Sequence, residues 1–115
     1  MIISRAFAAF GALVCAISVA LGAYASHVAT GQAKERMALA ALFAVAHGLA
    51  LIALATRESR LALLAKSAFA LAIVLFSGSL ALAACCGTAT TLAPFGGSLL
   101  MLGWTILAAD FLRTP

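Results

Sequence analysis

The chain has 115 residues, of which 66% are hydrophobic and 9% are charged, whereas soluble domains are about half apolar and a quarter charged. So short a chain cannot hide that much apolar surface inside a soluble monomer, and its mean hydropathy of +1.22 agrees. The net charge of +4 comes from scattered basic residues rather than a basic patch, so composition argues against a soluble enzyme, a disordered chain and a nucleic-acid-binding domain, and it favours a membrane protein.

Runs without a charged residue set the predicted elements in chain order. The first two runs, residues 6–33 and 37–56, are each long enough for one membrane-spanning helix of about 20 residues. The third run, residues 67–109, is long enough for two helices, and Gly87 and Pro94 lie in its middle. Glycine favours turns, and proline fits the first turn of a new helix. The third run therefore contains a turn between two spans.

The predicted helices cover residues 5–26, 34–55, 61–85 and 94–112. Short loops make consecutive helices antiparallel, and open sheets cannot lie in lipid. The sequence therefore predicts one transmembrane domain over residues 1–115, an all-α integral membrane bundle of four helices with up-down-up-down topology.

The basic residues predict the orientation. They fall on the two sides of the membrane as follows: Arg5, Arg57, Arg60, Lys66 and Arg113 on one side, Lys34 and Arg36 on the other. Cytoplasmic loops carry the excess of Lys and Arg. Both termini are therefore expected in the cytoplasm.

Small residues recur at helical spacing in the first predicted helix. Gly11, Cys15, Ser18, Gly22 and Ser26 share one face of it. Small residues let membrane helices approach closely. We favour packing within the bundle, and an interface between copies of the chain is the alternative.

His47 is the most informative polar residue, because it falls near the middle of the second helix and thus of the bilayer. Such groups are costly in lipid and usually face the bundle interior. We expect a serine hydroxyl, Thr105 or a backbone carbonyl to bond it and so fix helix packing. The functional alternative is a proton or ligand site, with the Ser77 and Ser79 hydroxyls lining a polar cavity beside it. His27 lies at the outer end of the first helix, so the two histidines do not match in depth as haem ligands, and two are too few for a metal site.

Two charged residues, Lys66 and Asp110, lie slightly inside the boundary on the side of the termini. We expect Lys66 to extend toward water. We also expect a Lys66–Asp110 or an Arg5–Asp110 pair to tie the helices together, and the alternative is a local pair between Asp110 and Arg113, three residues apart on one helix. Trp104 lies within the fourth helix, away from either boundary, and is interpreted as a packing residue.

Four short motifs occur in order along the chain. They are GAYASH at residues 22–27, His47 followed by LAL at 49–51, FSGSL at 76–80, and PFGG at 94–97 with GW at 103–104. Together these motifs resemble the domain-of-unknown-function 423 family, whose eukaryotic relative is transmembrane protein 256, over about residues 21–112. The candidate packing or motif residues are Gly22, His27, Gly78, Pro94, Gly96, Gly97, Gly103 and Trp104.

The chain departs from the family pattern at three places. Ala25 stands where the pattern has glycine, Phe43 and Ala44 where it has Tyr-Gln, and Ala81 where it has tyrosine. The missing tyrosine and glutamine are the polar groups most suited to supporting a site near His47.

The resemblance implies a small four-helix protein of the bacterial inner membrane and supplies no catalytic, cofactor or metal residues. We predict that the protein is not an enzyme, binds no cofactor and no nucleic acid, and contacts membrane lipid. We expect a structural or accessory component of a larger membrane complex or of a homo-oligomer. The alternative is a small transporter or channel subunit, with His47, Ser77 and Ser79 lining a polar path.

Overall fold

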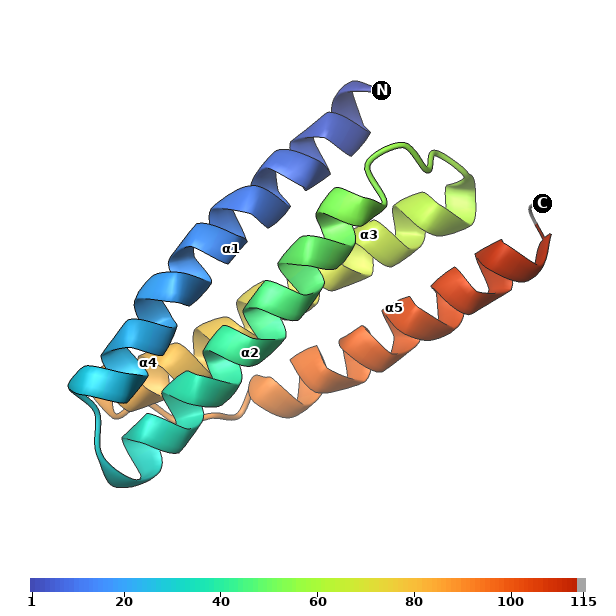
Figure 1. Ribbon diagram of the computed structural model, residues 1–115. Helices are drawn as coiled ribbons and strands as arrows, with labels where there is room; N and C mark the ends of the chain where they lie inside the picture. Colours follow the sequence, from blue (N-terminus) through green and yellow to red (C-terminus); the bar gives the residue numbers. More distant parts are fainter. Residues whose placement is uncertain (114–115) are drawn as a thin grey trace.

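The computed structural model describes residues 1–113 as helices joined by short loops (Figure 1). The elements in chain order are α1 (Ile2–His27), α2 (Gly31–Ala53), α3 (Arg60–Ala72), the π-helix η1 (Ile73–Gly78), α4 (Ser79–Cys86) and α5 (Ala93–Arg113). Because α3, η1 and α4 follow one another without a break, the described residues contain four helices long and apolar enough to cross a membrane. The predicted all-α, four-helix membrane bundle is confirmed.

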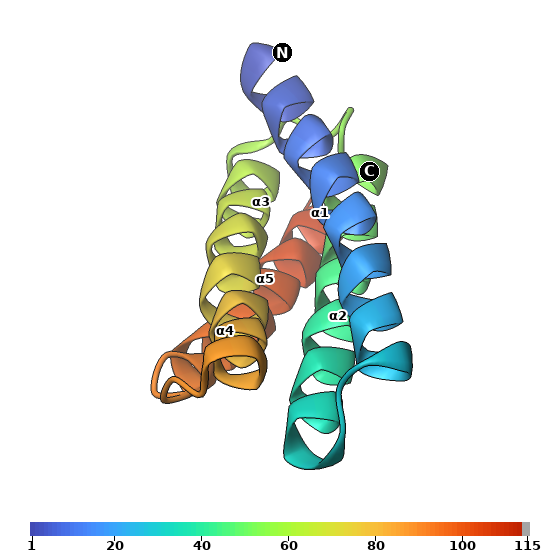
Figure 2. The same ribbon diagram turned by 90° about the vertical axis from the view of Figure 1, so that its left-hand side faces the viewer.

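The helices run alternately up and down (Figures 1 and 2). The N-terminus, the loop of residues 54–59 and the last turn of α5 lie at one end, which we call the terminal end. Residues 28–30 and 87–92 join helices at the other end, which we call the opposite end. Figure 2 shows that the first turns of α5, in orange, lie apart from the first turns of α2, in teal, at this opposite end.

Two helix ends follow from local sequence. The Ser59 side chain accepts a hydrogen bond of 3.0 Å from the Ala62 backbone N–H, which satisfies a donor that the first turn of α3 would otherwise leave unpaired. Gly87 ends α4 with φ of +69°, a conformation that glycine adopts without the steric cost of a Cβ.

The α1–α2 hairpin is held by a glycine contact between the two helices. A Cβ on Gly11 would lie 2.5 Å from the Gly48 carbonyl oxygen, and one on Gly48 would lie 2.8 Å from the Gly11 oxygen. Lipid gives helices no hydrophobic drive to associate, so close backbone approach supplies much of the attraction. Gly11 therefore serves packing within the bundle. A Cβ on Gly22, in the same stripe, would meet open space.

The second hairpin packs α5 against α3 and η1. A Cβ on Gly96 would lie 2.5 Å from the Phe76 backbone nitrogen, and one on Gly103 would lie 2.7 Å from the Phe69 ring. These two glycines let α5 lie directly on the backbone of η1 and on an aromatic ring of α3.

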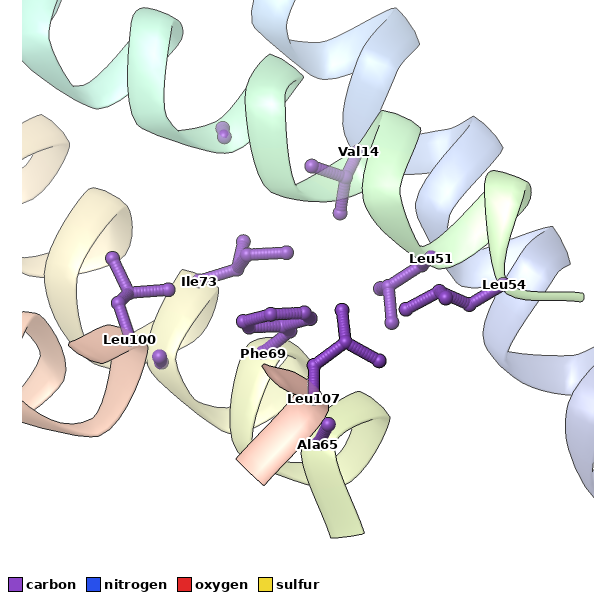
Figure 3. Close-up of a cluster of buried hydrophobic side chains, with 10 residues drawn as sticks. Val14, Leu51, Leu54, Ala65, Phe69, Ile73, Leu100 and Leu107 are labelled. Carbon is purple, nitrogen blue, oxygen red and sulfur yellow. The ribbon is translucent and has the colours of Figure 1, made fainter. Parts of the chain in front are cut away.

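A cluster of buried apolar side chains joins the two hairpins (Figure 3). Phe69 and Leu51 are fully buried in it, and Val14, Ile73, Leu100 and Leu107 pack around them. The outer surface is also apolar, with large side chains that face the bilayer, such as Leu13, Ile17, Val19, Leu71, Val74 and Leu102. An apolar exterior around a small core is the pattern expected in lipid.

Candidate functional site

His47 lies at the centre of the bundle and joins α2 to α5. Its Nδ1 lies 2.7 Å from the Phe43 carbonyl oxygen, and the Trp104 indole N–H donates a 2.9 Å hydrogen bond to its Nε2. Because indole nitrogen can only donate, Nε2 accepts and carries no proton, and Nδ1 carries the proton that it donates to Phe43. Both ring nitrogens are satisfied in the neutral Nδ1-H tautomer.

Aromatic rings surround this imidazole. The Phe43 ring stacks on it with centroids 6.0 Å apart, and the Phe69 and Trp104 rings lie 5.4 and 5.7 Å from it. Only 5% of the His47 surface is exposed. The polar ring is therefore enclosed by apolar groups and fixed in orientation by two hydrogen bonds.

A cleft of about 660 Å³ lies between α2 and α5. It extends from the His47–Trp104 pair toward the opposite end of the molecule. Its back wall is formed by Phe76 and Leu80, from η1 and α4. Most of the lining is apolar, and the polar side chains in it are Arg36, His47, Thr90, Ser98 and Trp104. The size is within the range of about 300–1,000 Å³ found for small-molecule sites.

Ser77 lies in η1 and bonds across the helix interface. Its hydroxyl donates a 2.8 Å hydrogen bond to the Ala40 carbonyl of α2, whereas serine in a membrane helix commonly bonds one turn back in its own helix. A π-helical turn redirects the side chains that follow it and recurs at functional sites. Here it joins η1 to α2.

The three residues of the expected polar path do not line one hollow. His47 faces the cleft between α2 and α5. Ser77 borders a separate hollow of about 280 Å³ beside α1, and Ser79 borders a third of about 390 Å³ beneath the α4–α5 loop. The structure therefore separates these polar groups.

The motif residues divide between packing and the cleft. Pro94, Gly97 and Trp104 line the cleft, while Gly96 and Gly103 make the close contacts of α5. A Cβ on Gly22 or Gly78 would meet open space. His27 is exposed at the end of α1. Among residues 1–113, no three His, Cys, Asp or Glu side chains lie together as metal ligands.

A buried basic group holds the terminal end together. Lys66 is fully buried, and its ammonium donates to the Ser4 hydroxyl at 3.0 Å and to the Leu54 and Arg57 carbonyls at 3.2 and 2.7 Å. These three acceptors use all three of its donors. The prediction that Lys66 extends to water is wrong, because backbone carbonyls at the end of α2 and in the following loop solvate the ammonium inside the protein.

Asp110 is a buried acidic residue at the same end, and it forms an ion pair with Arg57. Its carboxylate accepts from the Arg57 Nε at 2.5 Å and from the Ser59 hydroxyl, and it is 1% exposed. Arg57 in turn covers the Phe111 ring at 4.2 Å. Asp110 was expected to tie helices together, but Arg57 and Ser59, in the α2–α3 loop, were not foreseen as its partners.

Outside the spans, the N-terminal ammonium lies 2.9 Å from the Glu58 carboxylate. Its hydrogen bond and its charge hold the pKa of the Glu58 carboxyl below the usual value. This contact joins the start of α1 to the α2–α3 loop.

The sequence analysis did not predict the hydrogen bond of Trp104 to His47 or the position of Arg36 in the cleft. Arg36 served there only to predict orientation, and Trp104 was interpreted as packing. The partner of Trp104 could have been predicted, because a buried indole N–H needs an acceptor. Of the two histidines, His47 is the one closer to Trp104 in depth within the bilayer. Nothing in the sequence indicated that Arg36 faces a cleft.

A comparison with family models matches residues 21–97 to the family described as "Protein of unknown function (DUF423)". The match covers more than half of the chain and includes Arg36, His47 and all of η1. The chain therefore belongs to this family, as its four motifs indicate. No solved structure gives a significant match to the chain.

Proposed function

We propose that this member of the DUF423 family is a non-enzymatic accessory component of the bacterial inner membrane. It is a small four-span membrane protein. Its role in this proposal is to associate within the bilayer with a larger membrane complex or with further copies of itself, with lipid filling the remaining surface.

One observation carries the proposal: the buried polar side chains have hydrogen-bond partners within the chain. In residues 1–113, every buried side-chain nitrogen and oxygen has a hydrogen-bond partner. His47, Ser77 and Lys66 each bond another helix or loop. Groups that do acid–base chemistry must exchange protons with a substrate or water. Groups committed to internal bonds support a structural role instead.

The distribution of charge supports an orientation with both termini in the cytoplasm. The terminal end carries most of the basic residues, including Arg5, Arg57 and Arg60, and the opposite end carries Lys34 and Arg36. Under the positive-inside rule, the more basic end is cytoplasmic. A reporter enzyme that is active only in the cytoplasm, fused after Arg113, tests this orientation.

Stoichiometry in a mild detergent tests the accessory role. We expect the purified protein to elute either as a defined homo-oligomer or with one membrane protein at a fixed ratio, measured by light scattering and native mass spectrometry. A monomer without a partner, from membranes solubilised under several mild conditions, would contradict the proposal.

Thiol accessibility separates this role from transport. In a background with the three native cysteines replaced, we expect Ser77→Cys to resist a membrane-impermeant thiol reagent in vesicles. A cysteine at the native position Cys86, which is exposed, is the matched control and should react. Rapid labelling at position 77 from water would favour the transporter alternative.

A further inference from the structure

The cleft between α2 and α5 extends through about half of a bilayer. It reaches from Arg36, near the start of α2, to His47, which is about 16 Å along a helix at about 1.5 Å per residue. The hydrocarbon core of a bilayer is about 30 Å thick. The cleft therefore begins near the headgroups at the opposite end and stops near the midplane.

The end of the cleft near the midplane, which we call its floor, is closed. The Trp104–His47 hydrogen bond crosses from α5 to α2, and the Phe69 ring packs against the Trp104 ring with centroids 4.8 Å apart. Beyond these rings, Leu51 and Leu107 belong to the buried cluster that fills the space toward the terminal end (Figure 3). A transmembrane helix of a partner would need a groove through both leaflets, so the closed floor argues for a shorter occupant.

The cleft is amphipathic along its length. Phe43, Phe76, Leu100 and Met101 line its deeper part, and Arg36 lines its mouth. The Arg36 guanidinium makes no ion pair within residues 1–113, where the salt bridges are those of Glu58 and Asp110 at the other end of the molecule.

The start of α5 adds to the positive character of the mouth. Thr90 and Ser98 lie there beside Pro94, in the first turns of this helix and the loop before it. The N-terminus of a helix carries a partial positive charge. A cation at headgroup depth above an apolar cleft is complementary to a phospholipid, which has an anionic phosphate above its acyl chains.

We propose that the cleft binds one acyl chain of an anionic phospholipid from the leaflet at the opposite end, with the lipid phosphate on Arg36. The chain runs between α2 and α5 and ends against the Trp104–His47 pair. This inference goes beyond the proposed function and does not depend on it, because the lipid binds whether or not the protein has a protein partner.

Trp104 provides a direct assay, because it is the only tryptophan in the chain and it lines the cleft. The protein is placed in phosphatidylcholine nanodiscs that contain a few mole per cent of a phospholipid brominated near the end of its acyl chain. Bromine quenches indole fluorescence at contact. We expect brominated phosphatidylglycerol to be enriched about fivefold at Trp104 over brominated phosphatidylcholine, which corresponds to about 1 kcal/mol.

Two pairs of variants identify the site. Arg36→Gln should abolish the preference for phosphatidylglycerol, while Lys34→Gln, an exposed cation at the same end that does not line the cleft, should keep it. Ser98→Phe fills the mouth and should remove the extra quenching. Thr105→Phe is its matched control. The Ser98 and Thr105 hydroxyls are both exposed, and each donates to the carbonyl one turn back on α5. Thr105, however, lies outside the cleft.

Circular dichroism and elution volume first establish that each variant is folded. The proposal is overturned if the two brominated lipids quench Trp104 equally in the unmodified protein, or if Arg36→Gln keeps the preference. It is also overturned if Ser98→Phe leaves the quenching unchanged. If neither lipid quenches Trp104 and a second polypeptide shields it, a partner helix occupies the cleft instead.

Discussion

The contact between Gly96 of α5 and the backbone of η1 makes a sharp prediction about stability. In Gly96→Ala the new Cβ would lie 2.5, 2.8 and 2.9 Å from the nitrogen, Cβ and Cα of Phe76. Two of these atoms are backbone, so no side-chain rotation can relieve the overlap. Relief requires α5 to move away from η1 by nearly 1 Å, and a gap of about 0.5–1 Å forfeits about a quarter to a half of the dispersion energy of a contact.

The magnitude follows from opposing terms. Overpacking costs about 1–3 kcal/mol, and the backbone contacts place Gly96→Ala near the upper limit. Alanine is the better helix former by up to about 1 kcal/mol. We therefore expect Gly96→Ala to lower the free energy of unfolding by about 2 kcal/mol.

Gly97→Ala is a matched control in the next position of the same helix. Its Cβ would lie 3.7 Å from two atoms of the Phe76 ring, an ordinary contact, so this variant should equal the unmodified protein or gain up to about 1 kcal/mol. Both are measured by titration with sodium dodecyl sulfate in mixed micelles, followed by circular dichroism. Equal midpoints for the two variants, or a Gly96→Ala protein as stable as the unmodified one, would refute the reasoning.

Three further predictions concern other contacts. Gly11→Ala should cost about 2 kcal/mol, because its Cβ meets a carbonyl oxygen of α2, while Gly22→Ala should be neutral in the same titration; equal effects would contradict the close crossing. Trp104→Phe removes the donor to His47 Nε2, so the ¹⁵N resonance of Nε2 should shift while that of Nδ1 stays, and a shift of both would contradict the assigned tautomer. Asp110→Asn removes the charge that faces a partly exposed arginine and should cost about 2–3 kcal/mol; an unchanged titration midpoint would show that this ion pair contributes little.

The fold was predictable because charged residues are scarce in this chain. Lipid excludes unpaired charges, so the charge-free runs mark the spans directly. The turn between the third and fourth spans could also be predicted from the sequence, because Gly87 adopts the left-handed conformation that its position after α4 requires. Local sequence rules sufficed wherever the bilayer itself imposed the constraint.

The side-chain partners were less predictable, because they depend on how the helices are rotated about their axes. Lys66 was expected to reach water, and instead it is solvated by two backbone carbonyls and the hydroxyl of Ser4. Helical periodicity places a residue on a face but does not say which neighbour that face meets. The π-helical turn adds to the difficulty, since the regular spacing assumed for residues 61–85 does not hold through Ile73–Gly78.

The two ends of the molecule use their few charges in different ways. At the terminal end, Lys66 and Asp110 are buried and bonded to the loop between α2 and α3, so removing either one leaves an unsatisfied buried group and destabilises the fold. At the opposite end, Gly96 contacts the backbone of η1, and Arg36 lines the cleft without an ion pair in residues 1–113. We therefore expect Arg36 to contribute little to the free energy of folding. It follows that Asp110→Asn should change stability without changing lipid preference, and that Arg36→Gln should do the reverse.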